Sequence, residues 1–472
     1  MKRTYAVRKI SYKKGIQKML EKLFKLSKHG TNVKTEVMAG ITTFMTMAYI
    51  LAVNPSILGE AGMNPTAVLL ATAIASFIGT VCMAMMANLP FVLSAGMGLN
   101  AYFAYTVVLG MGYSWQIALF AVFVEGLIFI VLSLTNVREA IFNAIPLTLK
   151  RGVSVGIGLF IAFIGLQNAG IVVDSATLVT ITSFVNEFST HGISALLALA
   201  GLLITAILYI KGVKGSILLG IIATWLLGIV CQLVGIYVPT PEAGFYSLIP
   251  SAIVSVDFSA LGDTVFQCFN IDFGAIRFLD FVVVVFAFLF VDIFDTLGTL
   301  IGVATKADML DEEGRLPGIK PALMADSIGT TAGALLGTST ITTFVESASG
   351  ASAGGRTGLT AMVSAILFLL ATLFAPLFTS IPSFATAPAL IMVGYLMVSS
   401  VTEIRFDDDN MTEAIPAYIA IIAMPLCYSI SEGISLGIIS YVVLNVCTGK
   451  AKKVSPLMYV LAVLFILKYI FL

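Results

Sequence analysis

The stretch Gly337-Thr-Ser-Thr-Ile-Thr-Thr-Phe-Val-Glu-Ser-Ala-Ser-Gly350 decides the fold, because its two halves favour different backbone conformations. The first half is rich in β-branched residues, which favour extended chain. The second half consists of small residues that begin a helix, and Glu346 stands at the change. The helical part, 346–354, is too short to cross a bilayer alone, since a crossing helix needs about 20 residues. The stretch therefore predicts an extended segment followed by a half-helix.

The chain around this stretch is strongly apolar. Of 472 residues, 58% are hydrophobic and 11% are charged, whereas soluble domains carry about a quarter charged residues. This composition excludes a soluble enzyme, a secreted disulfide scaffold, a nucleic-acid binder and a disordered protein. Runs such as 217–239 and 361–381 are continuously apolar instead of alternating, which favours helices over a β-barrel. We therefore expect an all-α polytopic membrane protein.

The apolar runs divide the chain into about fourteen transmembrane segments. Two of them, 97–110 and 346–354, are short and follow the non-helical runs Leu89–Ala95 and Thr338–Val345. With the N-terminus inside, nearly all Lys and Arg fall in inner loops, and Arg277 is the exception. This predicts a multi-pass protein of the cell membrane with both termini cytoplasmic. The expected segments are 37–54, 66–87, 97–110, 115–134, 152–166, 193–210, 216–238, 278–303, 321–337, 346–354, 358–380, 384–400, 416–430 and 432–447.

A repeat relates the two halves of the chain. The motif Ala75-Ser-Phe-Ile-Gly-Thr80 recurs loosely as Ala325-Asp-Ser-Ile-Gly-Thr330, an offset of 325 − 75 = 250 residues. The same offset places Leu89–Ala95 on Ser339–Val345, so both broken segments coincide. Each half then has seven spans, and an odd number reverses the orientation of the second half. We expect two inverted seven-span repeats with strand-plus-half-helix breaks at segments 3 and 10.

The two ends of the chain differ from the spans. The leader, 1–35, holds eleven Lys or Arg and one acid, Glu21. It fits an amphipathic helix on the inner leaflet, with Ile16 and Leu20 on its apolar face, and fits a solvated basic tail equally well. The tail, 449–472, contains an apolar run that Lys468 interrupts. We expect it to be cytoplasmic or interfacial rather than a fifteenth span.

Acidic residues inside the spans are the candidates for function, because a carboxylate at the bilayer centre costs a few kcal/mol or more. Asp292 and Asp295 lie three residues apart in Phe290–Thr299, and Thr296 and Thr299 complete one polar helical stripe. Two such carboxylates cannot both ionise cheaply, so at least one should hold a proton. That property suits a proton-coupled carrier, while a polar packing seam is the alternative. The acids within spans are Glu125, Asp292, Asp295, Asp326, Glu346 and Glu432.

The two breaks supply further candidates. Glu346 can accept hydrogen bonds from a ligand, or simply complement the helix that it precedes. Asn100 occupies the matching break, in Ser94-Ala-Gly-Met-Gly-Leu-Asn100. Its amide can contact a ligand, or it can form hydrogen bonds only with the nearby backbone. Asp326 is expected to brace the core. The sequence contains no HExxH, GxSxG or Walker motif, so we expect no enzyme activity, no catalytic residue, no metal and no cofactor.

Four segments resemble the nucleobase–cation symporter type 2 family (nucleobase/ascorbate transporters), and within it the AzgA-like hypoxanthine/guanine/adenine permease branch. The similarity runs from about residue 33 to 448. It implies a core domain of spans 1–4 (36–136) and 8–11 (277–381), and a gate domain of spans 5–7 with an outer loop (137–276) and spans 12–14 (382–448). The resembling segments are Thr35–Pro55, Ala95–Phe103, Asp292–Thr299 and Thr342–Gly350.

The resemblance implies a substrate held between segments 3 and 10 and against the eighth span. The eighth span has Asp-Thr where the uracil and xanthine branches tend to have Glu-His or Glu-Ser, which favours adenine, guanine and hypoxanthine. We therefore expect import of purine bases by alternating access with protons, sodium being less favoured. A carrier of xanthine or uracil, or an anion carrier of the same fold, is the runner-up, and a homodimer is left open. The residues expected to bind substrate are Asn100, Asp292, Asp295, Thr296, Phe344 and Glu346. Of these, Asp292, Asp295 and Glu346 are expected to couple protons. Asp326 and Thr299 are expected to support them.

Overall fold

The computed structural model describes residues 18–134, 145–175, 178–185, 188–240, 245–250, 252–272, 274, 276–311, 316–407 and 410–471, without the side chains of residues 294, 305, 306, 468 and 471. Among these residues, nine helices are long and apolar enough to cross a membrane. Two shorter apolar helices, Met411–Leu426 and Pro456–Leu467, accompany them. The chain is a multi-pass helical membrane protein, as its composition predicts.

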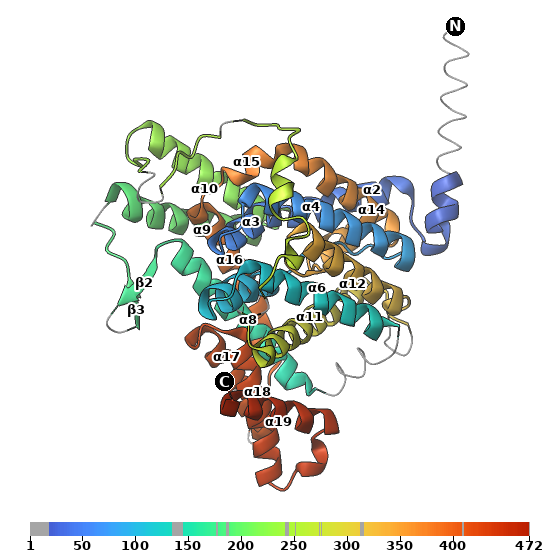
Figure 1. Ribbon diagram of the computed structural model, residues 1–472. Helices are drawn as coiled ribbons and strands as arrows, with labels where there is room; N and C mark the ends of the chain where they lie inside the picture. The colour runs from blue at the N-terminus through green and yellow to red at the C-terminus, as the bar shows by residue number, and fades with distance from the viewer. Residues whose placement is uncertain are drawn as a thin grey trace.

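The first half of the chain contains the segments expected for spans 1–7 (Figure 1). Its elements are α2 (Val33–Met47), α3 (Ile50–Glu60), α4 (Pro65–Cys82), η2 (Met83–Ala87), β1 (Leu93–Ala95), α5 (Met97–Ala101), η3 (Tyr102–Gly110), α6 (Trp115–Ser133), α8 (Leu147–Asn168), β2 (Val172–Ser175), β3 (Leu178–Ile181), η4 (Phe188–Gly192), α9 (Ile193–Ile210) and α10 (Ser216–Leu233).

The second half contains the segments expected for spans 8–14 and one further helix. Its elements are η6 (Ser259–Asp263), η7 (Gln267–Phe269), α11 (Phe278–Lys306), α12 (Ile319–Leu336), β4 (Ile341–Thr343), α13 (Ser347–Ser352), α14 (Gly358–Ala371), η9 (Thr372–Phe374), α15 (Ala375–Thr379), α16 (Ser383–Val398), η10 (Ser399–Glu403), α17 (Met411–Leu426), α18 (Ile430–Cys447), η12 (Ala451–Lys453) and α19 (Pro456–Phe471).

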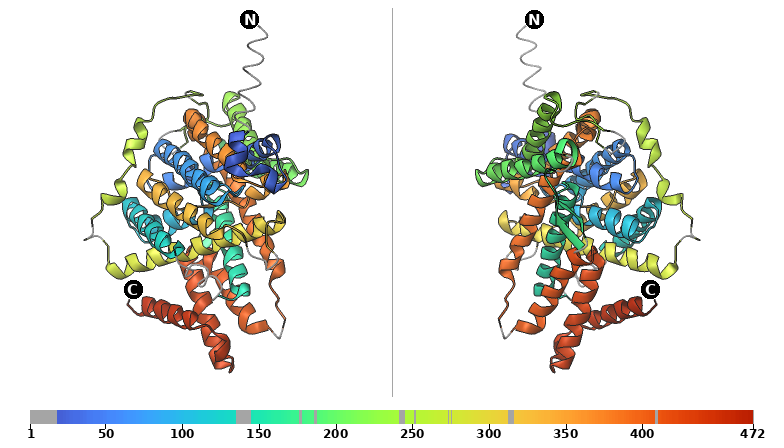
Figure 2. Two further views of the ribbon diagram at one scale, coloured as in Figure 1. Left: turned by 90° about the vertical axis from the view of Figure 1, so that its right-hand side faces the viewer. Right: turned by 90° about the vertical axis from the view of Figure 1, so that its left-hand side faces the viewer.

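The helices pack as two groups. Figure 2 shows the helical body from two sides, with the red C-terminal helices at its lower end. In one group α12 packs against α4 and α6, and α14 packs against α2 and α4. In the other, α8 packs against α16 and α17, α17 against α18, and α9 against α10. The division of these helices into a core domain and a gate domain stays a prediction.

The two predicted breaks lie side by side. Strands β1 and β4 pair antiparallel, with Leu93 opposite Thr343, and all six strand residues are buried. Each strand is followed by a short helix, α5 or α13. A buried extended segment needs partners for its backbone groups, and each break supplies them to the other. The prediction of strand-plus-half-helix breaks is confirmed, with strands shorter than the expected runs.

The repeat offset of 250 residues recurs in the packing. Leu93 and Thr343 are 250 apart and are direct strand partners. Gly79 of α4 and Gly329 of α12 are also 250 apart, and a Cβ added to either would lie 3.2 Å from the Cα of the other. Such mutual contacts between equivalent residues occur only where a two-fold relation maps each half onto the other. The antiparallel pairing agrees with inverted repeats.

The ends of the chain dock against this body. Residues 1–17 of the leader lie outside the described residues. Phe24 and Leu26 are buried, and the Phe24 carbonyl accepts a 3.1 Å hydrogen bond from Asn88. The tail forms α19, which packs against α18 and places Phe465 edge-on against Phe286 of α11. Whether the leader and α19 lie at the membrane interface stays a prediction.

Candidate functional site

Two positions directly before the half-helices define the centre of the site. Gly96 precedes α5 and Glu346 precedes α13, and the two residues are 346 − 96 = 250 positions apart. A Cβ at Gly96 would lie 2.4 Å from Thr342 Cγ2 and 3.3 Å from Asp295 Oδ2. A side chain at position 96 would therefore collide with the second break. The missing side chain lets the Asp295 carboxylate of α11 approach the first break.

Asp295 and Glu346 therefore meet where α5, α11 and α13 converge. Both carboxylates belong to half-buried residues, and Asp295 interacts electrostatically with Glu346 and with Asp326. The predicted pair is thus brought together from segments 8 and 10. Two partly accessible carboxylates beside each other form an acceptor surface for a ligand that carries N–H donors.

Tyr49 joins this centre, and the sequence reasoning missed it. Its hydroxyl donates a 2.7 Å hydrogen bond to Glu346 Oε1, and its side chain is 1% exposed. It stands at the break between α2 and α3. The available signal was a polar aromatic residue in an apolar span, within Met47-Ala-Tyr-Ile50. A tyrosine hydroxyl that is buried normally needs a partner, and here the partner is the Glu346 carboxylate.

Behind Asp295, Thr296 lies between two other acids. Its Oγ1 is 2.9 Å from Asp292 Oδ1 and 2.9 Å from Asp326 Oδ1, and 2.7 Å from Thr342 Oγ1. All four side chains are buried. Thr296 has one hydroxyl hydrogen and can donate to one carboxylate at a time. The other carboxyl group can form a hydrogen bond with Thr296 Oγ1 only if it carries a proton and donates it. This cluster therefore favours a proton held on Asp292 or Asp326.

Asn100 connects the two breaks. Its side chain is fully buried; its carbonyl accepts from the Ser339 hydroxyl, and its amide lies 3.5 Å from the Ala95 carbonyl. Next to Ser339, the Thr340 hydroxyl donates a 2.7 Å hydrogen bond to Glu125 of α6. The structure therefore places Asn100 as a brace between α5 and the extended chain before β4.

The remaining candidates surround this centre. Phe344 is 5% exposed and lies between β4 and Glu346, and its backbone N–H donates to the Val92 carbonyl at 3.0 Å. Thr299 is half-buried one turn beyond Asp295 on α11. The side chain of Phe294 is outside the described residues. Within the described part of the chain, no group of three His, Cys, Asp or Glu residues could hold a metal ion.

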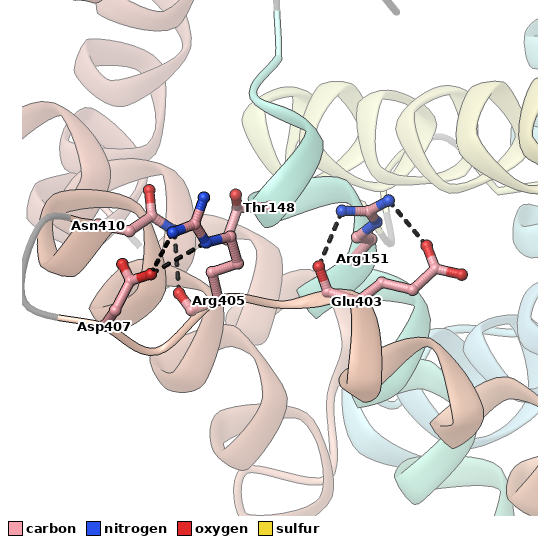
Figure 3. A pocket seen from close by; sticks show the side chains of 6 residues that line it. All are labelled: Thr148, Arg151, Glu403, Arg405, Asp407 and Asn410. Atoms are coloured by element: carbon pink, nitrogen blue, oxygen red, sulfur yellow. Dashed lines mark hydrogen bonds and ion pairs between the residues drawn. The ribbon is translucent and has the colours of Figure 1, made fainter.

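A separate cavity of about 290 Å³ lies on other elements, at the start of α8 and between η10 and α17 (Figure 3). Its charged side chains are paired with one another: Arg151 with Glu403 at 2.8 Å, and Arg405 with Asp407 at 2.7 Å. These pairs neutralise each other, and none of the lining residues belongs to a broken segment.

Two short helices that each follow a buried strand, beside the acids of a third helix, are an arrangement typical of secondary transporters. The model of the Permease family, which comprises nucleobase/ascorbate transporters, matches residues 34–436, and the chain belongs to this family.

Three relatives are similar to this chain over almost the whole length of both proteins. The chain is 51% identical to the putative permease MJ0326 of Methanocaldococcus jannaschii, covering 97% of this chain and 99% of that protein. It is 45% identical to the guanine/hypoxanthine permease PbuG of Bacillus subtilis (96% and 100% covered). It is 42% identical to the adenine permease AdeP of Escherichia coli K12 (96% and 97% covered).

Solved structures share the fold. The transmembrane domain of the cyanobacterial bicarbonate transporter BicA aligns with a TM-score of 0.60 at 16% identity, covering 86% of this chain and 97% of that one. The structure of SLC26A9 aligns with a TM-score of 0.58 at 11% identity, covering 88% and 66%. At these identities the similarity concerns the fold alone.

Proposed function

We propose that this protein is a secondary active transporter that imports purine nucleobases, namely guanine, hypoxanthine and adenine, together with protons. The observation that carries the proposal is the meeting of the Asp295 and Glu346 carboxylates at the two half-helices. Relatives named as adenine permease and as guanine/hypoxanthine permease, at 42% and 45% identity, support the purine class.

The chemistry of the site suits a flat neutral ring. Guanine presents N1–H and an exocyclic amine, hypoxanthine presents N1–H, and adenine presents its amine. Each can donate to Asp295 or Glu346, and hydrogen bonds to a carboxylate are stronger than those between neutral groups. Phe344, two residues before Glu346, offers a ring for packing. An anion carrier of the same fold would need a cation at this position, whereas the described side chains here are carboxylates, hydroxyls and an amide.

Proton coupling rests on the acids of α11 and their neighbours. Asp295 and Glu346 are close enough to repel each other when both are ionised, so protonating one favours entry of a neutral substrate. Behind them, Thr296 can serve Asp292 and Asp326 together only when a proton is shared among them. We assign proton coupling to Asp292, Asp295 and Glu346, and a supporting role to Thr296, Thr299, Asp326 and Asn100.

Transport would proceed by alternating access. The core, spans 1–4 and 8–11, carries every substrate-site residue and moves against the gate, spans 5–7 and 12–14. The packing of α12 and α14 with α4, and of α8 with α16 and α17, supports two bodies of this composition. We place the protein in the cell membrane with both termini in the cytoplasm.

The experiment is uptake of radiolabelled bases in a strain lacking its own purine permeases. We expect uptake of guanine, hypoxanthine or adenine above the empty-vector level, and strongly reduced uptake in Asp295→Asn at an unchanged amount of protein in the membrane. Uptake of xanthine or uracil alone would support the runner-up carrier and overturn the purine assignment.

A further inference from the structure

Glu346 is held by a helix that precedes it by some 300 residues. Tyr49, in the break between α2 and α3, donates to Glu346 Oε1 at 2.7 Å. At the other end of α2, the buried Glu36 carboxylate accepts from the backbone N–H groups of Arg356 at 2.9 Å and Thr360 at 3.1 Å, just after α13. Helix α2 thus contacts the chain on both sides of this half-helix.

Between these two anchors the backbones meet closely. A Cβ at Gly350 in α13 would fall 2.0 Å from Thr43 Oγ1 and 2.9 Å from the Ala39 carbonyl oxygen, both on α2. Three fixed contacts along one helix leave α13 little freedom to slide. Tyr49 follows α2 by two residues, so its hydroxyl stays on Glu346 Oε1 because α2 cannot move away without displacing α13.

This contact limits what Glu346 offers to a substrate. A carboxylate can bind two adjacent N–H donors, one on each oxygen, as it does with an arginine fork. Here Oε1 already accepts from a buried hydroxyl, and Oε2 is the oxygen that Tyr49 does not contact. The Tyr49 hydroxyl takes one of the two lone pairs of Oε1 and weakens that oxygen as an acceptor for a second donor. A ring that approaches Glu346 then finds Oε2 as the stronger of two unequal acceptors.

We propose that Tyr49 is a specificity-determining residue that restricts Glu346 to a single hydrogen bond with the purine. Resting on the proposed purine transport, this inference predicts how the site ranks its substrates. Guanine presents N1–H and the 2-amino group side by side, whereas hypoxanthine presents N1–H without the amine. With Oε1 occupied, the extra donor of guanine gains no carboxylate partner here, so the two purines bind with similar affinity.

The first test uses the wild-type protein and competition uptake. Inhibition constants for unlabelled guanine and hypoxanthine should differ by less than about three-fold, because each forms one hydrogen bond with Glu346. A two-point contact would favour guanine by about ten-fold or more, since a hydrogen bond to a charged group contributes at least that factor. A wild-type preference for guanine of that size overturns the proposal without requiring any variant.

The second test is Tyr49→Phe, which keeps the ring and removes the hydroxyl. With Oε1 released, the inhibition constant for guanine should fall about ten-fold relative to that for hypoxanthine, and the adenine-to-hypoxanthine ratio should stay within about two-fold. The ratio is independent of how much protein reaches the membrane. Equal changes for guanine and hypoxanthine would show that Tyr49 acts only on stability.

Two controls separate the possible failures. Tyr441→Phe removes the hydroxyl of another buried tyrosine, on α18 away from the site, and should leave both ratios unchanged. Tyr49→Phe combined with Glu346→Gln should lose the guanine gain, because the amide offers one acceptor. If no purine competes with any other in the wild type, the proposed function fails; if purines compete but the ratios do not respond, the role of Tyr49 fails.

Discussion

Gly96 and Glu346 occupy equivalent positions in the two repeats, yet only one of them carries a carboxylate. Each stands directly before a half-helix, and 250 residues separate them. Beside Gly96 the carboxylate is that of Asp295 on α11, whose Oδ2 would lie 3.3 Å from a Cβ added at Gly96. Helix α11 thus supplies to the first break, through Asp295, the kind of carboxylate that the second break carries as Glu346.

The role of Asp295 can be tested with Asp295→Asn, which keeps the size of the side chain and removes its charge. We expect purine uptake to fall by roughly ten- to a hundred-fold, because a hydrogen bond to a charged acceptor contributes about 1.5–3 kcal/mol. The measurement is initial uptake rate normalised to protein in the membrane. Asp280→Asn is the matched control, since Asp280 lies in the first turn of the same helix and pairs with Arg277 at 3.2 Å. Wild-type affinity in Asp295→Asn would contradict the assignment.

The absence of a side chain at position 96 should be required. In Gly96→Ala the new methyl would fall 2.4 Å from Thr342 Cγ2, so we expect at least ten-fold weaker substrate affinity. Gly96→Ala with Thr342→Ser removes the opposing methyl and should restore part of the affinity. On α11, Gly298→Ala meets no atom within 4 Å and should transport normally. A fully active Gly96→Ala variant would show that the close approach has no function.

Coupling should be protonic. The site contains two neighbouring carboxylates, and a proton on one of them must accompany a neutral ring, so uptake should slow as the external pH rises and collapse with a protonophore. Uptake into proteoliposomes with an imposed pH gradient or an imposed sodium gradient distinguishes the two ions. Transport that follows the sodium gradient and ignores the protonophore would refute proton symport.

Discrimination against other bases should follow from the acceptors. Xanthine carries a second carbonyl where hypoxanthine carries only C2–H, and a carbonyl facing a carboxylate adds lone-pair repulsion. A buried acceptor left unpaired costs about 1–3 kcal/mol, so xanthine and uracil should compete roughly ten- to a hundred-fold more weakly than hypoxanthine. Competition uptake with unlabelled bases measures this. Strong displacement by uracil or xanthine would contradict the proposed arrangement of acceptors.

The sequence predicted the architecture because hydrophobic length and local backbone preference are local properties. The apolar runs located the spans, and β-branched residues before Glu346 located a break that the structure confirms. The contact of Tyr49 with Glu346 could not be predicted from the sequence, because it joins residues 297 positions apart and depends on how α2 packs against α13. Asn100 was expected to face the substrate, and its hydrogen bond with Ser339 likewise depends on the pairing of the two breaks.

The register of β1 and β4 fixes the spacing of the site. Leu93 and Thr343 face each other, and Gly96 and Glu346 each follow three residues later in the chain, beyond the ends of the strands. Deleting one residue from either strand would turn every following side chain to the opposite face and carry position 96 or 346 out of its place. The two breaks can therefore change in residue type far more easily than in length, and new substrates are reached by substitution at fixed spacing instead of by insertion.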